Sequence, residues 1–392
     1  MSIPENLKFI YLPKNRLNSV NSLAKILEVN ADEFIQTASQ QYKYKSKKIP
    51  KKNGKIRIIN KPSPSIRKVQ NLLNHRFIRP NIKWPSYIYG CIPNSIDTET
   101  QLIIRKDYVA CASAHCQAKS ILHLDISDFF DNISNVHIKN IFTNFFNIKK
   151  EDVCNKLTEI VTYKNSLPQG GLTSSYLASL LFFDSEPLIV HRLNSKGLTY
   201  TRLIDDITLS TKKPNYDFKS EIITIRNMLS NYDLHINEEK MYIEHFSTKP
   251  MVVHSLRVDQ KHPRYDKREI RRIRTLIHNI QEQAKIPTYR NNYFYRKDYY
   301  RCMGTINKLS RTNQYYHRNF LKKIIKLSPL PCLKDIKNLN ILIEKLENTP
   351  IEHRNLFHFL KRKNIAKNRI SLIKKIYTHE AKKLAGRIDA LK

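Results

Sequence analysis

Two adjacent carboxylates, Asp205 and Asp206, occupy the middle of the segment 200–210, with β-prone residues on both sides. This pattern predicts a β-hairpin whose turn lies at or near the acidic pair. Side chains alternate across a strand, so we expect the two carboxylates to project in different directions. A solvated surface turn explains most such pairs, and the case for chemistry depends on a second acidic strand upstream.

The second acidic strand is predicted over 121–130, sequence ILHLDISDFF. Its apolar residues alternate, which places Asp125 on the face opposite the core, where a metal ligand belongs. The other explanation is structural: Asp125 is then an ordinary edge residue, and Asp128 is a helix N-cap. Between the acidic strands, the loop LPQGGLTSS at 167–175 has two of the chain's seven glycines in adjacent positions, which lets the backbone approach a ligand closely.

Carboxylates that converge on one sheet can hold two Mg²⁺ ions roughly 3.5–4 Å apart, an arrangement that promotes in-line phosphoryl displacement. Magnesium takes oxygen ligands and keeps waters and substrate phosphates in its shell, so two or three aspartates suffice. Nucleotidyl transfer with two Mg²⁺ ions is therefore the reaction that these residues predict.

The chain of 392 residues has a formal net charge of +35, with 69 Lys and Arg against 34 Asp and Glu. This excess predicts a polyanionic partner, and nucleic acid is the first candidate. The length allows a sizeable core and two or three subdomains. No signal peptide, membrane-spanning apolar run or zinc-ligand cysteine spacing is recognisable. We therefore expect a cytoplasmic protein with reduced thiols and no membrane partner.

Two strongly basic regions flank the acidic strands. A basic loop at 45–55 runs into a strand at 56–59 and a helix at 65–74, and is either a flap that grips phosphates or a solvated surface. Beyond Pro263 the chain is helical and interleaves aromatic residues with cations, a pattern that suits backbone gripping and stacking. A helical bundle with a solvated basic face explains this pattern as well, and both explanations can hold. The residues predicted to bind nucleic acid are Arg271, Arg272, Arg274, Tyr299 and Arg301.

Six segments, in order along about residues 45–325, resemble the reverse transcriptases of bacterial retrons and related phage-defence systems. They look like the fingers motif, the first acidic motif, the dNTP-pocket motif, the YxDD box, the lysine-bearing motif and the thumb segment of that family. Each match alone is weak, and the shared order makes the resemblance specific. In sequence they are KNGKIRIINKP (52–62), LDISDFFDNI (124–133), LPQGGLTSS (167–175), LIDD (203–206), NEEK (237–240) and RCMGTINKL (301–309).

The resemblance implies that Asp125 and Asp205 bind both metal ions. Asp206 is then the second carboxylate of the box, and Ile126 belongs to the metal site beside Asp125. Lys240 is the candidate proton donor to pyrophosphate. These residues, with two Mg²⁺ ions, make up the catalytic centre that the resemblance implies.

For the nucleotide, the resemblance implies that Lys52 and Arg57 hold the triphosphate, with Lys51 and Lys55 as alternatives for the lysine position. Phe130 would occupy the steric-gate position, where its ring would clash with a ribose 2′-hydroxyl and favour dNTPs over NTPs. The whole implied nucleotide site comprises Lys52, Arg57, Asp128, Phe129, Phe130 and Gln169.

Three features depart from the family pattern. Leu203 replaces the usual tyrosine of the box, the retron-specific Asn-Ala…His segment is not recognisable in 92–116, and VHS at 253–255 replaces Val-Thr-Gly. These departures predict a defence-associated reverse transcriptase of a neighbouring clade rather than a standard retron enzyme.

The implied fold is an α+β right-hand polymerase. N-terminal helices and fingers are expected at 1–120, a palm with an antiparallel sheet at 121–260 (with part of the fingers around 140–175), and a basic helical thumb with a C-terminal extension at 261–392. The implied function is RNA-directed DNA synthesis from dNTPs on a dedicated non-coding RNA, in antiviral defence, with an effector or second polymerase protein as a further partner.

Two other functions stay open at this point. One is a template-independent or protein-primed DNA polymerase that uses the same site. The other is a non-catalytic RNA-binding scaffold with the polymerase fold. Idle carboxylates that face a polyanion would repel it, which argues against the scaffold.

Overall fold

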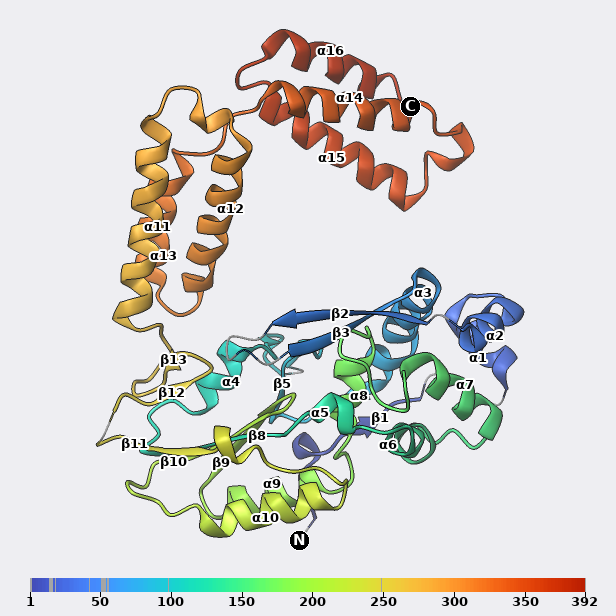
Figure 1. The fold of residues 1–392 in the computed structure, drawn as a ribbon, viewed down its shortest axis with the longest axis vertical. Coiled ribbons are helices and arrows are strands. Elements are labelled where there is room, and N and C mark those ends of the chain that lie inside the picture. Colours follow the sequence, from blue (N-terminus) through green and yellow to red (C-terminus); the bar gives the residue numbers. More distant parts are fainter. Residues whose placement is uncertain are drawn as a thin grey trace. The chain divides into compact units, whose positions relative to one another are not determined.

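A computed structural model describes residues 2–13, 17, 19–41, 43–50, 54, 56–97, 99–247 and 249–391. The chain forms two compact units, Met1–Pro263 and Arg264–Lys392 (Figure 1). The segments predicted as fingers and palm both lie in the first unit. Among the described residues, no helix combines the length and apolar character needed to cross a bilayer.

A five-stranded sheet forms the centre of the first unit, in the spatial order β11-β8-β10-β9-β5. All pairs are antiparallel except β5 with β9. Alternation in β8 buries Leu122 and Leu124 in the core and leaves His123 and Asp125 on the opposite face, as predicted. The strands are β5 (Ile88–Tyr89), β8 (Ser120–Asp125), β9 (Thr199–Leu203), β10 (Asp206–Thr211) and β11 (Tyr242–His245).

Two helices, α9 (Glu186–Ser195) and α10 (Lys219–Ser230), cover one face of this sheet (Figure 1). The predicted amphipathic pattern of α10 is confirmed, because Ile225 and Leu229 are fully buried. A single apolar core connects the sheet with these helices and with the helices nearer the N-terminus. The helices therefore cover one face of the sheet, and the face that carries the aspartates is not covered by them.

A long antiparallel ribbon follows the first two helices. The segment 45–50, expected to be loop, belongs to strand β2, because each of its residues pairs with one in β3. The ribbon leads into α3, which begins with Pro64 at its first turn and a Ser63 side-chain cap. These elements are α1 (Val20–Leu27), α2 (Ala31–Ser39), β2 (Tyr44–Pro50), β3 (Ile56–Pro62) and α3 (Pro64–Leu72).

The remaining elements of the first unit are short. The helices are α4 (Tyr108–Ala114), α5 (Phe129–Asn132), α6 (Asn135–Asn140), α7 (Glu151–Val161) and α8 (Ser174–Leu180). The paired strands are β1 (Ile10–Tyr11) with β4 (Ile82–Lys83), β6 (Ser95–Ile96) with β7 (Ile103–Ile104), and β12 (Val252–Val253) with β13 (Leu256–Arg257).

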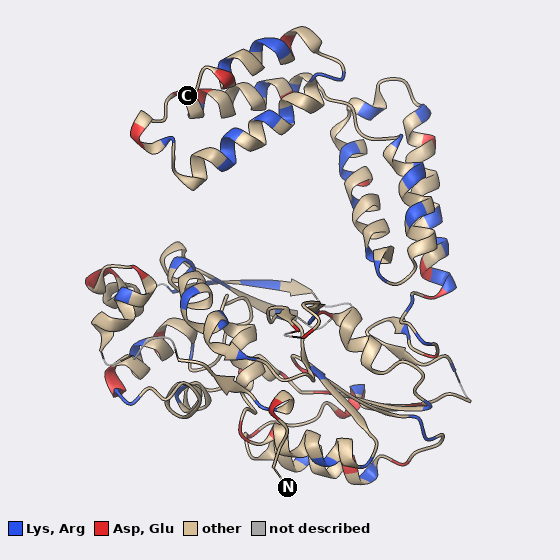
Figure 2. Cartoon of the chain, turned by 180° about the vertical axis from the view of Figure 1, so that it is seen from behind, with Lys and Arg blue, Asp and Glu red and all other residues tan. Residues whose placement is uncertain are grey.

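The second unit is entirely helical in its described residues. It holds 32 Lys and Arg against 10 Asp and Glu, and Figure 2 shows the basic residues distributed along all its helices. The last three helices have an apolar core of their own. In order, the helices are α11 (Lys267–Lys285), α12 (Tyr293–Asn307), α13 (Gln314–Ile325), α14 (Leu333–Glu347), α15 (Phe357–Ile373) and α16 (Thr378–Asp389).

Candidate active site

The three aspartates meet where strands β8 and β10 lie side by side. Asp206 is the first residue of β10 and lies opposite Asp125, the last residue of β8. Asp205 occupies the two-residue turn between β9 and β10, and its carbonyl accepts a hydrogen bond from the Ile126 amide at 3.1 Å. The hairpin and the convergence predicted from the sequence are therefore present.

The turn that carries Asp205 is strained. Ile204 has φ +63°, a left-handed conformation that a β-branched residue rarely adopts. The fully buried Arg202 stabilises this turn, because its Nη1 donates a hydrogen bond to the Ile204 carbonyl at 3.2 Å. Arg202 is itself held by the equally buried Glu186 of α9, at 2.6 and 2.8 Å.

Sequence reasoning did not identify Arg202 or Glu186 as residues that shape the site. The available signal was a charged arginine inside an otherwise uncharged strand, two residues before the acidic turn. A fully buried guanidinium needs a carboxylate partner, and no feature of the sequence alone points to Glu186.

Lys240 and Asn237 contact Asp125 from the segment after α10. The Lys240 ammonium lies 2.9 and 2.8 Å from the two carboxylate oxygens, and the Asn237 amide donates to one of them at 3.3 Å. The hydrogen bond to Asp125 raises the pKa of Lys240, so this side chain carries a proton at neutral pH. Lys240 thus lies at the predicted site, and Asn237 is a contact that the sequence analysis missed.

The carboxylates disfavour one another's ionisation. Burial, together with the Asp205 and Asp125 carboxylates, raises the pKa of Asp206 to about 6. Burial also raises the pKa of Asp205, and the Asp125 charge adds to the effect. Among the described residues, no three His, Cys, Asp or Glu side chains are arranged as a ready-made metal cluster. The donors are oxygens alone and mutually repulsive, which fits a hard divalent cation that keeps other ligands in its shell.

A cavity of about 710 Å³ opens on one side of Asp125. Arg57 of β3 and Gln169 line it together with Asp205 and Lys240, so the predicted nucleotide residues from distant segments do meet here. Lys52 lies outside the described residues, as do its two alternatives. The predicted nucleotide-site residues Asp128, Phe129 and Phe130 line the cavity as well, as does Ile126 of the predicted metal site.

One predicted nucleotide contact and one structural alternative need correction. The Phe129 ring is 2% exposed and packs against Phe182, so a ligand can reach little more than its backbone. Asp128 has φ +44° and makes no capping hydrogen bond to α5, so it is not the side-chain cap considered above. Phe130 is only partly buried and keeps its ring at the cavity.

The glycine pair serves a contact within the protein. A Cβ at Gly170 would lie 2.8 Å from the Asn60 carbonyl of β3, and the φ of +118° also requires glycine. The Asn60 amide in turn donates to the Gln169 carbonyl at 2.8 Å. The close approach predicted for this loop is therefore to the β3 strand rather than to a ligand, and it positions Gln169 and Arg57 at one cavity.

A second cavity, of about 540 Å³, also borders Asp125. Asp206 lines it with His123, Tyr242 and His254. The His123 and Tyr242 rings stack with centroids 4.5 Å apart. Tyr242 and His254 were missed, because the sequence gives no sign that their segments lie beside β8.

The predicted nucleic-acid residues of the second unit fall into two groups. Arg271, Arg272, Arg274 and Arg301 are exposed on α11 and α12. Tyr299 is 5% exposed and packs against Tyr295, so the prediction that it stacks on nucleic acid at the surface is wrong. The helical pitch explains this, since the apolar face of α12 includes Tyr295, Tyr299 and Cys302.

Comparison with known proteins identifies the family of the chain. The family described as reverse transcriptase (RNA-dependent DNA polymerase) matches residues 49–284. The chain is also 38% identical to the Retron Ec48 reverse transcriptase of Escherichia coli, over 88% of this chain and 85% of that protein. The chain belongs to the retron-type reverse transcriptases. This reverse transcriptase is 33% identical to the Retron Se72 reverse transcriptase of Salmonella heidelberg, over 78% of its own length and 77% of the relative.

A solved structure of apo telomerase from Candida tropicalis is similar over 97% of the present chain and 74% of the telomerase chain. The TM-score is 0.41 and the identity 10%, a likeness too distant to carry an argument. The family assignment establishes that the enzyme is an RNA-directed DNA polymerase, and it confirms the predicted right-hand α+β fold. Because both relatives are retron enzymes, the departures at Leu203 and 253–255 give no reason to place the chain in a neighbouring clade.

Proposed function

We propose that this reverse transcriptase extends DNA with dNTPs on a dedicated non-coding RNA, using two Mg²⁺ ions at Asp125, Asp205 and Asp206. The observation that carries the proposal is the convergence of these carboxylates between two cavities at the ends of β8 and β10. Asp125 lines both cavities, whereas Asp205 lines the first and Asp206 the second.

Each of the two cavities holds one of the two reactants. The first holds the incoming dNTP, with Arg57 on the triphosphate, Gln169 in the pocket wall and Phe130 against the sugar. The second holds the primer end, and the stacked His123 and Tyr242 rings supply its aromatic wall. The reacting atoms then meet at Asp125, which borders both spaces.

Asp125, Asp205 and Asp206 would hold the metal ions with the Ile126 carbonyl beside them. Bound Mg²⁺ lowers the pKa of the attacking 3′-hydroxyl and neutralises charge on the triphosphate. Lys240, protonated at neutral pH and next to Asp125, gives its proton to the departing pyrophosphate. Arg202 holds the Ile204 turn and thereby fixes Asp205.

The proposed partners follow from charge and family. The exposed arginines of α11 and α12 bind the phosphates of the RNA and of the RNA–DNA duplex. The resemblance to phage-defence reverse transcriptases supports a role in antiviral defence with an effector or second polymerase protein. Six free cysteines support a location in the cytoplasm.

Primer extension on a defined RNA template tests the catalytic assignment. With Mg²⁺ and four dNTPs, the wild-type chain should extend a DNA primer, and Asp205→Asn with Asp206→Asn should abolish extension. Lys240→Ala should slow single-nucleotide addition on the order of a hundredfold, within the usual range for general-acid catalysis. Extension by the double variant at the wild-type rate would exclude these aspartates as the metal site.

A further inference from the structure

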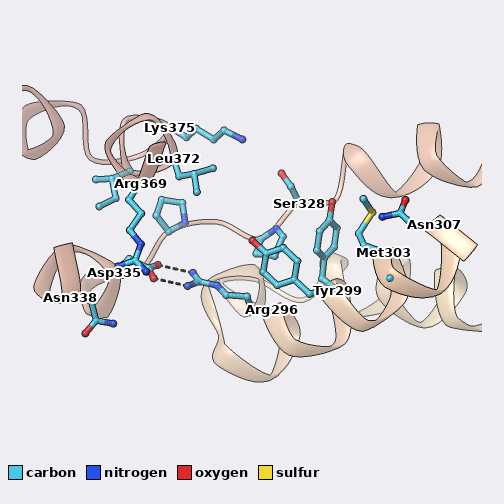
Figure 3. Close-up of a pocket in the computed structure, with 15 residues that line it drawn as sticks. Arg296, Tyr299, Met303, Asn307, Ser328, Asp335, Asn338, Arg369, Leu372 and Lys375 are labelled. Atoms are coloured by element: carbon cyan, nitrogen blue, oxygen red, sulfur yellow. Dashed lines mark hydrogen bonds and ion pairs between the residues drawn. The ribbon is translucent and has the colours of Figure 1, made fainter. Parts of the chain in front are cut away.

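The second unit contains a cavity of about 850 Å³ that the polymerase reaction does not use (Figure 3). Its walls come from α12, from the segment 328–331, from the beginning of α14 and from the end of α15. Its lining includes Arg296, Tyr300, Gly304, Asp335, Arg369, Leu372 and Lys375.

The cavity is preformed by strong side-chain contacts. Arg296 of α12 grips Asp335 of α14 with two parallel hydrogen bonds of 2.5 and 2.6 Å, drawn in Figure 3. Arg296 also donates to the Leu330 carbonyl at 3.1 Å, and Arg290 donates to the Ser328 carbonyl at 2.6 Å. The connecting segment is thus held by α12 and by Arg290 just before it, so a ligand meets a wall that is already ordered.

Gly304 indicates that the open space is functional. It lies within α12, where glycine destabilises a helix by about 1 kcal/mol relative to alanine. Its φ is not left-handed, and an added Cβ would meet nothing within 4 Å, so neither strain nor close packing requires glycine. What glycine does here is to leave the cavity free of a side chain.

The lining combines flat apolar surface with positive charge. Tyr300 is 59% exposed and Leu372 is 50% exposed, so both offer surface to a ligand. Arg369 and Lys375 add two cations, and neither has an ion-pair partner among the residues that the structure describes. Asn307 and Asn338 supply amide groups that can donate and accept hydrogen bonds.

We propose that this cavity binds an unpaired nucleotide of the RNA, with the base against Tyr300 and Leu372 and the phosphate at Arg369 and Lys375. An aromatic face beside cations is the usual chemistry for single-stranded RNA. The base must be unpaired, because a base stacked in a duplex cannot enter a pocket. The large basic excess of this unit favours RNA over an acidic peptide. The inference rests on the proposed function, in which the chain carries a dedicated RNA.

Filling the cavity tests the inference. Gly304→Leu places a side chain in the open space, and Gly386→Leu is the matched control. Gly386 also lies within a helix, with nothing within 4 Å of an added Cβ, but it lies outside the cavity. The probe is an eight-nucleotide oligouridylate with one 4-thiouridine, bound to the full chain in about 0.3 M salt to reduce non-specific binding.

Gly304→Leu should weaken binding of the probe about tenfold, the loss expected from one base–aromatic stack, and Gly386→Leu should leave it unchanged. Both variants should unfold at or slightly above the thermal unfolding temperature of the wild type, because leucine favours a helix more than glycine does. On ultraviolet irradiation, the wild-type chain should cross-link the probe to a peptide of the cavity, from α12 or the end of α15.

Two variants that each lose one arginine provide an independent test. Arg369→Gln should weaken probe binding severalfold, whereas Arg362→Gln, exposed on the same helix outside the cavity, should not. Equal affinities of Gly304→Leu and Gly386→Leu, or cross-links confined to other peptides, would overturn the inference. Primer extension by the wild-type chain is measured in parallel, so that failure of the cavity and failure of the proposed function are told apart.

Discussion

At the scale of single residues, we propose that Phe130 determines which sugar the first cavity accepts. Its ring lies at the cavity edge in contact with the buried Phe129, with ring centroids 5.9 Å apart. Phe129 thus supports the Phe130 ring, and Phe130 lines the cavity proposed for the nucleotide. A ribose 2′-hydroxyl would meet the ring, whereas a deoxyribose would not.

Phe130→Ala should therefore admit ribonucleotides. We expect the preference for dNTPs over NTPs, measured as a ratio of kcat/KM values, to fall on the order of tenfold to a hundredfold, the range over which pocket size discriminates. Phe130→Tyr keeps the ring and should keep the preference. An unchanged preference in the alanine variant would show that another residue excludes the 2′-hydroxyl.

At the scale of secondary-structure elements, the acidic turn depends on a buried ion pair between β9 and α9. Arg202 and Glu186 are both fully buried, and Arg202 also donates to the Ser179 carbonyl at 2.9 Å. A buried pair is not strongly stabilising as a whole, but loss of one partner leaves an uncompensated charge in the core. Replacing either residue of the pair should therefore disturb the turn.

Glu186→Gln should lower the free energy of unfolding of the first unit by about 3–5 kcal/mol, the cost of breaking such a pair. Arg226→Ala is the control, because it removes an exposed pair with Glu238, and exposed pairs contribute about 1 kcal/mol or less. Denaturant unfolding measures both. Equal effects of the two substitutions would show that the buried pair does not hold the turn.

In the second unit, the Arg296–Asp335 pair connects α12 with α14. The Arg296 hydrogen bonds lower the pKa of Asp335 to about 2, so this contact stabilises the fold above the unfolded pKa of about 4 and is lost as pH falls towards 2. Asp335→Asn should lower the unfolding temperature by a few degrees at pH 7. The difference between wild type and variant should shrink below pH 4, and a constant difference down to pH 2.5 would contradict this assignment.

The sequence predicted an element well where the residue pattern within that one strand or helix was sufficient. Alternation in β8 placed Asp125 correctly, and the β-prone flanks of Asp205 predicted the hairpin. It could not predict contacts between segments far apart in the chain, such as Gly170 with Asn60 or Arg202 with Glu186. Tyr299 was assigned to the surface because aromatic and basic residues alternate there, whereas the helical pitch buries it.

At the scale of the whole molecule, the net charge of +35 should make RNA binding depend strongly on contacts with phosphates. Each phosphate contact releases counterions, so affinity should fall steeply with salt. Replacing Arg271, Arg274 and Arg301 with Gln should reduce the slope of log K against log salt by about 2–3, roughly one for each lost contact. An unchanged slope would place the phosphate contacts elsewhere.

The most direct test of the central claim is to sequence the DNA that the purified enzyme makes on its co-purifying RNA. The reaction contains Mg²⁺ and four dNTPs, and the Asp205→Asn, Asp206→Asn variant is the control. Templated synthesis predicts DNA complementary to that RNA, absent from the control. A repetitive or homopolymeric product unrelated to the RNA would contradict templated synthesis, as would tight RNA binding with no DNA product.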